Sequence, residues 1–265
     1  MAEIDENSPA MPVETSRRTF MQALAASTVL GTMAEASMEA ARQPAPIQAL
    51  AFDAYGTLFD VFSVTALCEE LFPGRGTALA QAWRAKQLQY SLLRSLMERH
   101  ADFWRLTEDG LVWAARSLQL DLTAARKARL MDAYLRLAAF PDVVPGLKAL
   151  KDRGVRLAIL SNGEPKMLRA AADSAGVTSL LDAVISVEEV GIFKPNPRVY
   201  ALAGTHLGTE RRLGFVSSNS WDIAGAGSAG LTTFWIQRSA AEPPEELGFP
   251  ATHVVRSLAE LSALL

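Results

Sequence analysis

The sequence predicts an α/β protein, with a parallel β-sheet core, helices on both faces of the sheet and an α-helical cap inserted after the first strand. From Ile47 onward, short apolar runs alternate with helical patterns, which is the order typical of parallel strands joined by helical crossovers. Residues 61–140 break that alternation, because they separate the first two apolar runs and have helical spacing throughout. A connection of that length inside a compact domain needs structure of its own.

Five apolar runs are the candidate strands: residues 47–53, 155–161, 183–187, 213–217 and 232–237. Between them, helices are expected over 145–154, 165–176, 196–208 and 222–230, and several of these end in glycine at a C-cap position. In the inserted unit, the helical patterns are strongest over 78–97 and 125–140. We therefore expect a core made of residues 47–60 and 141–265, and a cap made of residues 61–140.

The segment before the core, residues 1–46, has the pattern of an export signal followed by a linker. Arg17 and Arg18 stand two residues before Phe20 and lead into a mildly apolar run over 23–34. That run is shorter than the ~20 residues that span a bilayer, so we expect no membrane helix in the mature form. The stretch resembles twin-arginine signals, which implies export of the folded protein to the periplasm. A disordered tail with a chance arginine pair, in a cytoplasmic protein, is the alternative.

Composition excludes several classes of protein. The chain is 49% hydrophobic and 21% charged, which is the balance of a globular protein. Its formal net charge of −3 provides no basic surface for nucleic acid. Cys68 is the only cysteine, so the chain can form neither an internal disulfide nor a thiolate metal cluster. Its three histidines, His100, His206 and His253, lack metal-ligand spacing, and we assign them no role.

Polar side chains gather where the predicted strands end. Asp53 ends the first apolar run, although burying an unpaired carboxylate is costly. Ser161 and Asn162 end the second run, and Ser217 ends the fourth. Lys194, Tyr200, Asn219 and Asp222 lie in the segments that follow later runs. Because the carboxyl ends of parallel strands meet at one edge of a sheet, we expect these groups to share one site in a cleft between core and cap.

Four stretches carry a resemblance to a known family. They are "FDAYGTLFD", "LSNG", "FKPNPRVY" and "FVSSNSWD". In order and spacing they resemble the four motifs of the haloacid dehalogenase superfamily, over most of residues 47–260. The cap stretches "WRAKQLQYSLLRSLM" and "DAYLRLA" also resemble the (S)-2-haloacid dehalogenase branch. The resemblance implies a Rossmann-like core and hydrolysis of short-chain (S)-2-haloalkanoic acids to (R)-2-hydroxy acids and halide.

The resemblance also implies roles for individual residues. Asp53 would attack the halogen-bearing carbon and form an ester that water then hydrolyses. Lys194 would keep Asp53 ionised and meet the substrate carboxylate, together with backbone N–H groups near Ser161 and Asn162. Arg84 would accept the halide, with Asn162 as its partner on the core side. Three groups of positions also match. Water and Lys194 would be positioned by Ser217, Asn219 and Asp222, and the nucleophile and the lysine would be supported by Thr57 and Tyr200. An apolar wall would be formed by Tyr55, Leu88, Phe103 and Trp221. The resemblance implies no cofactor, no metal and a homodimer.

Two other functions stay open. One is a small-molecule phosphatase of the same superfamily, whose members carry a second aspartate two residues after the nucleophile and bind Mg²⁺ through acidic groups. Here those positions hold Tyr55 and Ser217, which disfavours a phosphatase, whereas loss of a halide needs neither acid nor metal. The other is a non-catalytic binding protein of the same fold. Arg84 could equally be a surface residue of an amphipathic helix, and Phe103 and Trp221 could be core residues.

Overall fold

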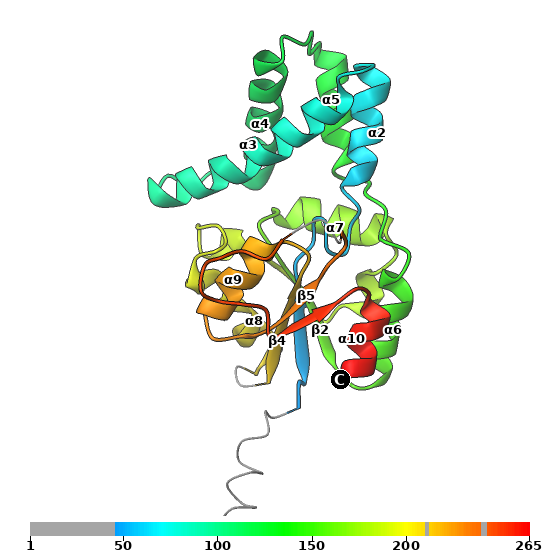
Figure 1. Ribbon diagram of the computed structural model, residues 1–265, viewed down its shortest axis with the longest axis vertical. Helices are drawn as coiled ribbons and strands as arrows, with labels where there is room; N and C mark the ends of the chain where they lie inside the picture. The colour runs from blue at the N-terminus through cyan, green and yellow to red at the C-terminus, as the bar shows by residue number, and fades with distance from the viewer. Residues whose placement is uncertain (1–45, 210–211, 240–242) are drawn as a thin grey trace, which may run out of the picture. The chain divides into compact units, whose positions relative to one another are not determined.

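The computed structural model describes residues 46–209, 212–239 and 243–265, so the predicted export signal lies outside the described residues. These residues form a sheet of six strands in the order β3-β2-β1-β4-β5-β6, in which all neighbouring pairs are parallel (Figure 1). The strands are β1 (Ala49–Phe52), β2 (Arg156–Ser161), β3 (Ala183–Ser186), β4 (Leu213–Ser217), β5 (Thr232–Ile236) and β6 (His253–Val255). The predicted fold class is confirmed, and β6 is a strand that the sequence did not indicate.

Helices cover both faces of the sheet. Helix α6 packs against α10 on one side, and α8 packs against α9 on the other (Figure 1). The helices of the core are α6 (Val143–Asp152), α7 (Pro165–Ser174), α8 (Pro197–Leu207), α9 (Ser220–Ser228) and α10 (Leu258–Leu264), with short 3-10 turns η1 (Thr178–Leu180) and η2 (Val187–Glu189). With both faces covered, β1 is buried at every residue, which explains its continuous apolar run.

The inserted segment folds as four helices, which lie beyond the ends of the strands, at the top of Figure 1. They are α2 (Phe62–Leu71), α3 (Gly76–Leu96), α4 (Phe103–Ser117) and α5 (Ala124–Ala133). Local sequence sets where two of them begin, because the side chains of Asp102 and Thr123 accept hydrogen bonds from backbone N–H groups in the first turns of α4 and α5. Among the described residues, no helix is both long enough and apolar enough to cross a membrane.

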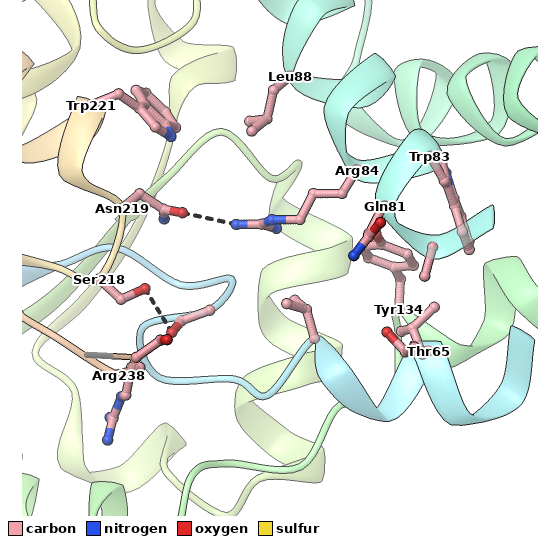
Figure 2. Close-up of a pocket in the computed structure, with 15 residues that line it drawn as sticks. Thr65, Gln81, Trp83, Arg84, Leu88, Tyr134, Ser218, Asn219, Trp221 and Arg238 are labelled. Carbon is pink, nitrogen blue, oxygen red and sulfur yellow. Dashed lines mark hydrogen bonds between the residues drawn. The ribbon is translucent and has the colours of Figure 1, made fainter. Parts of the chain in front are cut away.

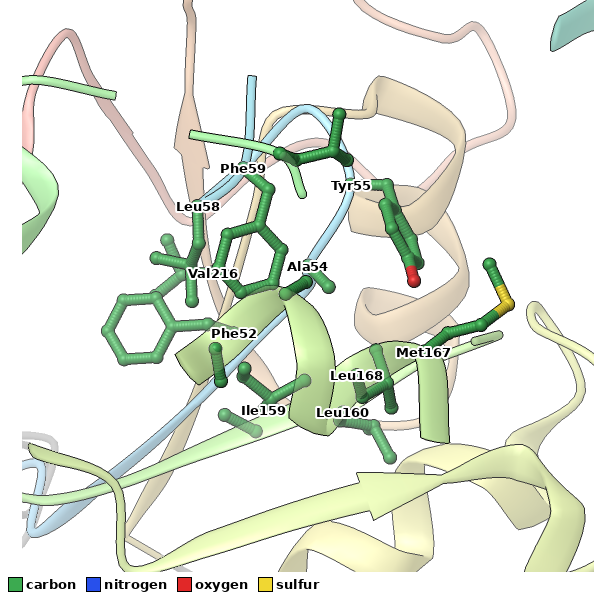
Figure 3. Packing of buried hydrophobic residues seen from close by; sticks show 14 of the residues in the cluster. Phe52, Ala54, Tyr55, Leu58, Phe59, Ile159, Leu160, Met167, Leu168 and Val216 are labelled. Carbon is green, nitrogen blue, oxygen red and sulfur yellow. The ribbon is translucent and has the colours of Figure 1, made fainter. Parts of the chain in front are cut away.

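The carboxyl end of β1 is fixed by its neighbours. Phe52 lies in register with Ile159 of β2 and Val216 of β4, and the backbone N–H of Asp53 donates to the carbonyl of Val216 at 2.9 Å. Apolar side chains of the loop that follows, such as Phe59, pack into the same core (Figure 3). The sheet therefore delivers Asp53 to a rigid position at its carboxyl edge, which is where ligands bind in open α/β sheets.

Candidate active site

Asp53 is nearly buried, and three donors surround its carboxylate. The Nζ of Lys194 lies 3.1 Å from Oδ1, while the hydroxyl of Thr57 and the Nδ2 of Asn219 donate to Oδ2 at 3.1 Å and 2.8 Å. A carboxylate has about four lone-pair positions, and these three donors occupy most of them. The carboxylate is therefore compensated for its burial.

Lys194 bridges two carboxylates. Its Nζ also donates to Oδ2 of Asp222 at 2.8 Å, and both side chains are almost completely buried. Burial alone would lower the pKa of Lys194, but the nearby charges of Asp222 and Asp53 outweigh it and raise that pKa. For Asp222, burial raises the pKa and Lys194 opposes the shift. Tyr200 donates its hydroxyl to Oδ1 of Asp222 at 2.7 Å, so the acid that holds the lysine is itself held.

The loop between β4 and α9 connects these groups to the nucleophile loop. Ser217 accepts a hydrogen bond from the backbone N–H of Asn219 at 3.1 Å, which fixes the turn that aims Asn219 at Asp53. The backbone N–H of Ser218 donates to the Thr57 hydroxyl at 2.8 Å, and the Ser218 hydroxyl donates to the Gly56 carbonyl at 2.7 Å. Sequence analysis gave Ser218 no role, although it lies within the motif "FVSSNSWD". In the structure Ser218 links the two loops through these hydrogen bonds.

The turn after β2 contributes backbone rather than charge. Ser161 is buried, and its hydroxyl accepts from the N–H of Gly163 at 3.2 Å. The Oδ1 of Asn162 accepts from the backbone N–H of Lys194 at 3.0 Å, which fixes the start of the lysine side chain. Both residues lie at the strand-to-helix turn before α7, where N–H groups suit an anion.

Arg84 comes from the cap and reaches the core. From α3, its guanidinium crosses to Asn219 and donates to Oδ1 at 2.9 Å (Figure 2). In the structure Arg84 thus bonds to Asn219, whereas the amide oxygen of Asn162 accepts from Lys194, and the joint reception of halide by Arg84 and Asn162 stays a prediction. Through Asn219, Arg84 connects to Asp53. Arg84 is thus no surface residue of its helix.

Two cavities adjoin this network. One, of about 350 Å³, is lined by Arg84, Leu88, Asn219 and Trp221 among others (Figure 2). Another, of about 120 Å³, is lined by Leu88, Ser91, Leu92, Lys194 and Trp221 and is almost wholly apolar. Leu88 and Trp221 thus line both cavities, as expected of an apolar wall. No acidic side chain belongs to the described lining of either cavity, which suits an anionic ligand.

Tyr55 and Phe103 are buried, and their rings stack with centroids 6.1 Å apart. The hydroxyl of Tyr55 is buried without a hydrogen-bond partner among the described residues. Burial, followed by the nearby Tyr134 and Asp53, raises the pKa of Tyr55 far above its ordinary value. Where a phosphatase would carry an acid, this chain therefore has a group that retains its proton.

Sequence analysis assigned no functional role to His100, in the cap, or to Glu188, in the core. In the structure their side chains contact each other. The Nε2 of His100 lies 2.9 Å from Oε2 of Glu188. No local signal could indicate this pair, because the two residues are far apart in the chain. Among the described residues, no group of three or more His, Cys, Asp or Glu side chains is placed to hold a metal ion.

Comparisons with known proteins agree with this geometry. A family model described as a haloacid dehalogenase-like hydrolase matches residues 47–230. The (S)-2-haloacid dehalogenase of Pseudomonas sp. strain YL is 48% identical over 213 residues, which are 80% of this chain and 91% of that protein. The (S)-2-haloacid dehalogenase of Pseudomonas putida is 43% identical over 217 residues, with 82% and 95% covered. The structure of the L-2-haloacid dehalogenase from Xanthobacter autotrophicus with chloropropionic acid covalently bound matches with a TM-score of 0.77 at 38% identity, covering 82% and 98%.

Proposed function

The chain belongs to the haloacid dehalogenase-like hydrolases, in their (S)-2-haloacid dehalogenase branch, and from that premise we propose how its residues catalyse dehalogenation. The enzyme hydrolyses the carbon–halogen bond of short-chain (S)-2-haloalkanoic acids, giving (R)-2-hydroxyalkanoic acids and halide. The observation that carries the mechanism is the carboxylate of Asp53, held by Lys194, Thr57 and Asn219 next to a cavity that Arg84 enters.

In the first step, Asp53 attacks C2 of the substrate from the side opposite the halogen. A carboxylate oxygen forms a bond to C2 while the carbon–halogen bond breaks, and its electron pair leaves with the halide. Lys194 and the backbone N–H groups at Ser161 and Asn162 hold the substrate carboxylate. Arg84 receives the halide, and it must leave Asn219 in part to do so. The covalently bound chloropropionic acid in the Xanthobacter enzyme supports this ester.

In the second step, water attacks the carbonyl carbon of the Asp53 ester. The bond between that carbon and the ester oxygen that Asp53 supplied breaks, and this oxygen leaves as the hydroxyl of the 2-hydroxy acid. The water oxygen stays in the restored carboxylate, and one proton goes to solvent. Negative charge develops on the remaining Asp53 oxygen, where Asn219 and Thr57 already donate, and such placed donors lower the barrier. Ser217 fixes the turn of Asn219, while Asp222 and Tyr200 hold Lys194 in place.

Halide release from the two enantiomers of 2-chloropropionate tests this function. We expect release from the S enantiomer, with R-lactate as product, and the same rate after dialysis against EDTA. Asp53→Asn should abolish release in a folded protein, because an amide is a far poorer nucleophile. Near wild-type release by an undeamidated Asp53→Asn variant would refute the mechanism. A strict Mg²⁺ requirement, with turnover of a phosphoester, would instead favour a phosphatase.

A homodimer is the proposed assembly. Large apolar side chains are exposed on the cap, with Leu96 81% and Met97 57% exposed. They lie near a groove of about 430 Å³ between α3 and α4 that includes Leu93, Met97 and Trp113, and exposed apolar patches of this kind mark interaction surfaces. Sedimentation should give a dimer, and Leu96→Glu should shift it to monomer. A wild-type monomer at micromolar concentration would contradict the assembly.

Export to the periplasm is proposed from the sequence of residues 16–36. Replacing Arg17 and Arg18 with lysine should leave a full-length precursor in the cytoplasm, because the twin-arginine pattern requires the pair. The absence of a shortened protein from periplasmic fractions of cells that make the wild type would refute the proposal.

A further inference from the structure

The backbone N–H groups of Phe193 and Lys194, which belong to two consecutive peptide groups, are held from two sides. Asn162, in the core, accepts from the backbone N–H of Lys194 at 3.0 Å. Ser95, in the cap helix α3, accepts from the backbone N–H of Phe193 at 3.1 Å. The Ser95 hydroxyl donates its own proton to the carbonyl of Ser91 at 2.9 Å, so the helix itself sets the direction in which Ser95 accepts. Two consecutive backbone N–H groups thus have different partners: that of Lys194 bonds to the core, and that of Phe193 bonds to the cap.

The side chain of Phe193 adds a second set of contacts to the cap. It is fully buried, and its ring lies 4.9 Å from that of His100 and 6.1 Å from that of Phe103. Phe103 in turn stacks on Tyr55, which lies two residues after Asp53. His100 is itself tied to the core by Glu188 at 2.9 Å. Phe193, which precedes Lys194, therefore contacts the cap in two ways: its backbone N–H bonds to Ser95, and its ring packs against His100 and Phe103.

Helix α3 presents Arg84 and Ser95 on one face. The two residues are eleven positions apart, which at 3.6 residues per turn is about three full turns, or about 16 Å along the helix. Leu88 and Ser91 lie between them at helical spacing, and both line the smaller cavity beside Lys194. One rigid helix face therefore meets Asn219 at one end and the Lys194 segment at the other.

We propose that Ser95 is a positioning residue, which couples the seating of the cap to the aim of Lys194 at Asp53. The inference rests on the proposed function, since Lys194 matters there because it holds Asp53 and the substrate carboxylate. The same position of α3 against the core lets Arg84 reach Asn219 and lets Ser95 accept from the amide of Phe193. The halide acceptor and the lysine thus become ordered together.

Ser95→Ala tests this coupling, because it removes the acceptor while alanine preserves the helix. Loss of this partly buried hydrogen bond should speed amide exchange at Phe193 about two- to tenfold and lower kcat to a similar extent. The unfolding temperature should change little. Ser95→Thr keeps a hydroxyl and should restore both values. Ser117→Ala is the matched control, because Ser117 lies in the cap helix α4 and its hydroxyl donates within that helix, to the carbonyl of Ala114 at 2.9 Å.

The outcomes separate this proposal from the proposed function. Unchanged exchange at Phe193 in Ser95→Ala would overturn the coupling, and so would faster exchange with an unchanged kcat. An equal loss of kcat in Ser117→Ala would also overturn it, because any weakening of the cap would then suffice. If the wild type releases no halide, the proposed function fails, whereas the exchange comparison still decides whether Ser95 holds the amide of Phe193, the residue before Lys194.

Discussion

At the scale of single residues, the site depends on charges that are buried only because they are paired. Lys194 is 1% exposed and lies between Asp53 and Asp222, so each ion compensates another. Removing one partner of such a group typically costs about 3–5 kcal/mol, because a buried charge is left alone. The same pairing favours the cationic form of Lys194 by raising its pKa.

The raised pKa of Lys194 predicts how activity and stability depend on alkaline pH. Because the folded pKa lies above the ordinary value of about 10.4, the lysine stabilises the fold fully below that value. This contribution is lost as the pH rises through the folded pKa. Asp222→Asn removes the largest charge that raises the pKa, so the alkaline limb of kcat/KM should move to lower pH. Profiles of kcat/KM and of unfolding free energy check this, and an unmoved limb would show that another group controls it.

Arg84 has a separate test, because its guanidinium should interact most strongly as charge moves onto the halogen. Arg84→Lys keeps the charge but loses the planar set of donors, and we expect a loss of about 10²- to 10³-fold in kcat. Rates on 2-chloro- and 2-bromopropionate should be compared, and the loss should be larger for chloride, whose charge is more concentrated. Unchanged rates for both substrates with Arg84→Lys and Arg84→Ala would remove Arg84 from the mechanism.

At the scale of elements, close approach between α9 and the lysine loop keeps the site compact. A Cβ added at Gly225 would lie 2.5 Å from Cβ of Pro195 and 2.5 Å from the hydroxyl oxygen of Tyr200. Neither distance is compatible with an ordinary contact, so α9 or the loop would have to move. The glycine is therefore required by packing rather than by backbone conformation.

Gly225→Ala should accordingly destabilise the fold by about 1–3 kcal/mol, the usual cost of overpacking, and should lower kcat by displacing Tyr200 from Asp222. Denaturant unfolding and halide release measure the two effects. Gly230→Ala is a poor control because its φ is +85°, and Ala226→Gly is one too, because Ala226 is fully buried and the change also removes a core methyl group. An alanine at position 225 with wild-type stability and kcat would show that α9 adjusts freely.

Sequence predicted the elements better than it predicted their contacts. Five of the six strands overlap the predicted runs, because strands covered on both faces are apolar throughout. Strand β6 was missed, since it has three residues, with a half-buried His253 and an exposed Val254, and carries no apolar run. Asn162 and Asn219 both follow strand ends, and nothing local shows which of them faces Arg84. Ser95 was missed for the same reason, because its partner lies across the cap boundary.

At the scale of the whole described molecule, the site exists only where cap and core meet. The core supplies Asp53, Lys194 and Asn219, and the cap supplies Arg84 and Ser95. Arg84 bonds directly to Asn219 (Figure 2). The proposed nucleophile, Asp53, therefore comes from the core, and the proposed halide acceptor, Arg84, comes from the cap.

The central claim is that Asp53 becomes covalently attached to the substrate, and a single turnover in ¹⁸O-labelled water tests it most directly. With enzyme in excess over (S)-2-chloropropionate, the hydroxyl oxygen of the product should come from Asp53 and be unlabelled. The label should appear in Asp53, where mass spectrometry of the peptide containing residues 51–61 would find it. Labelled hydroxyl in the first product, with an unlabelled Asp53, would mean that water attacks C2 directly and would contradict the account.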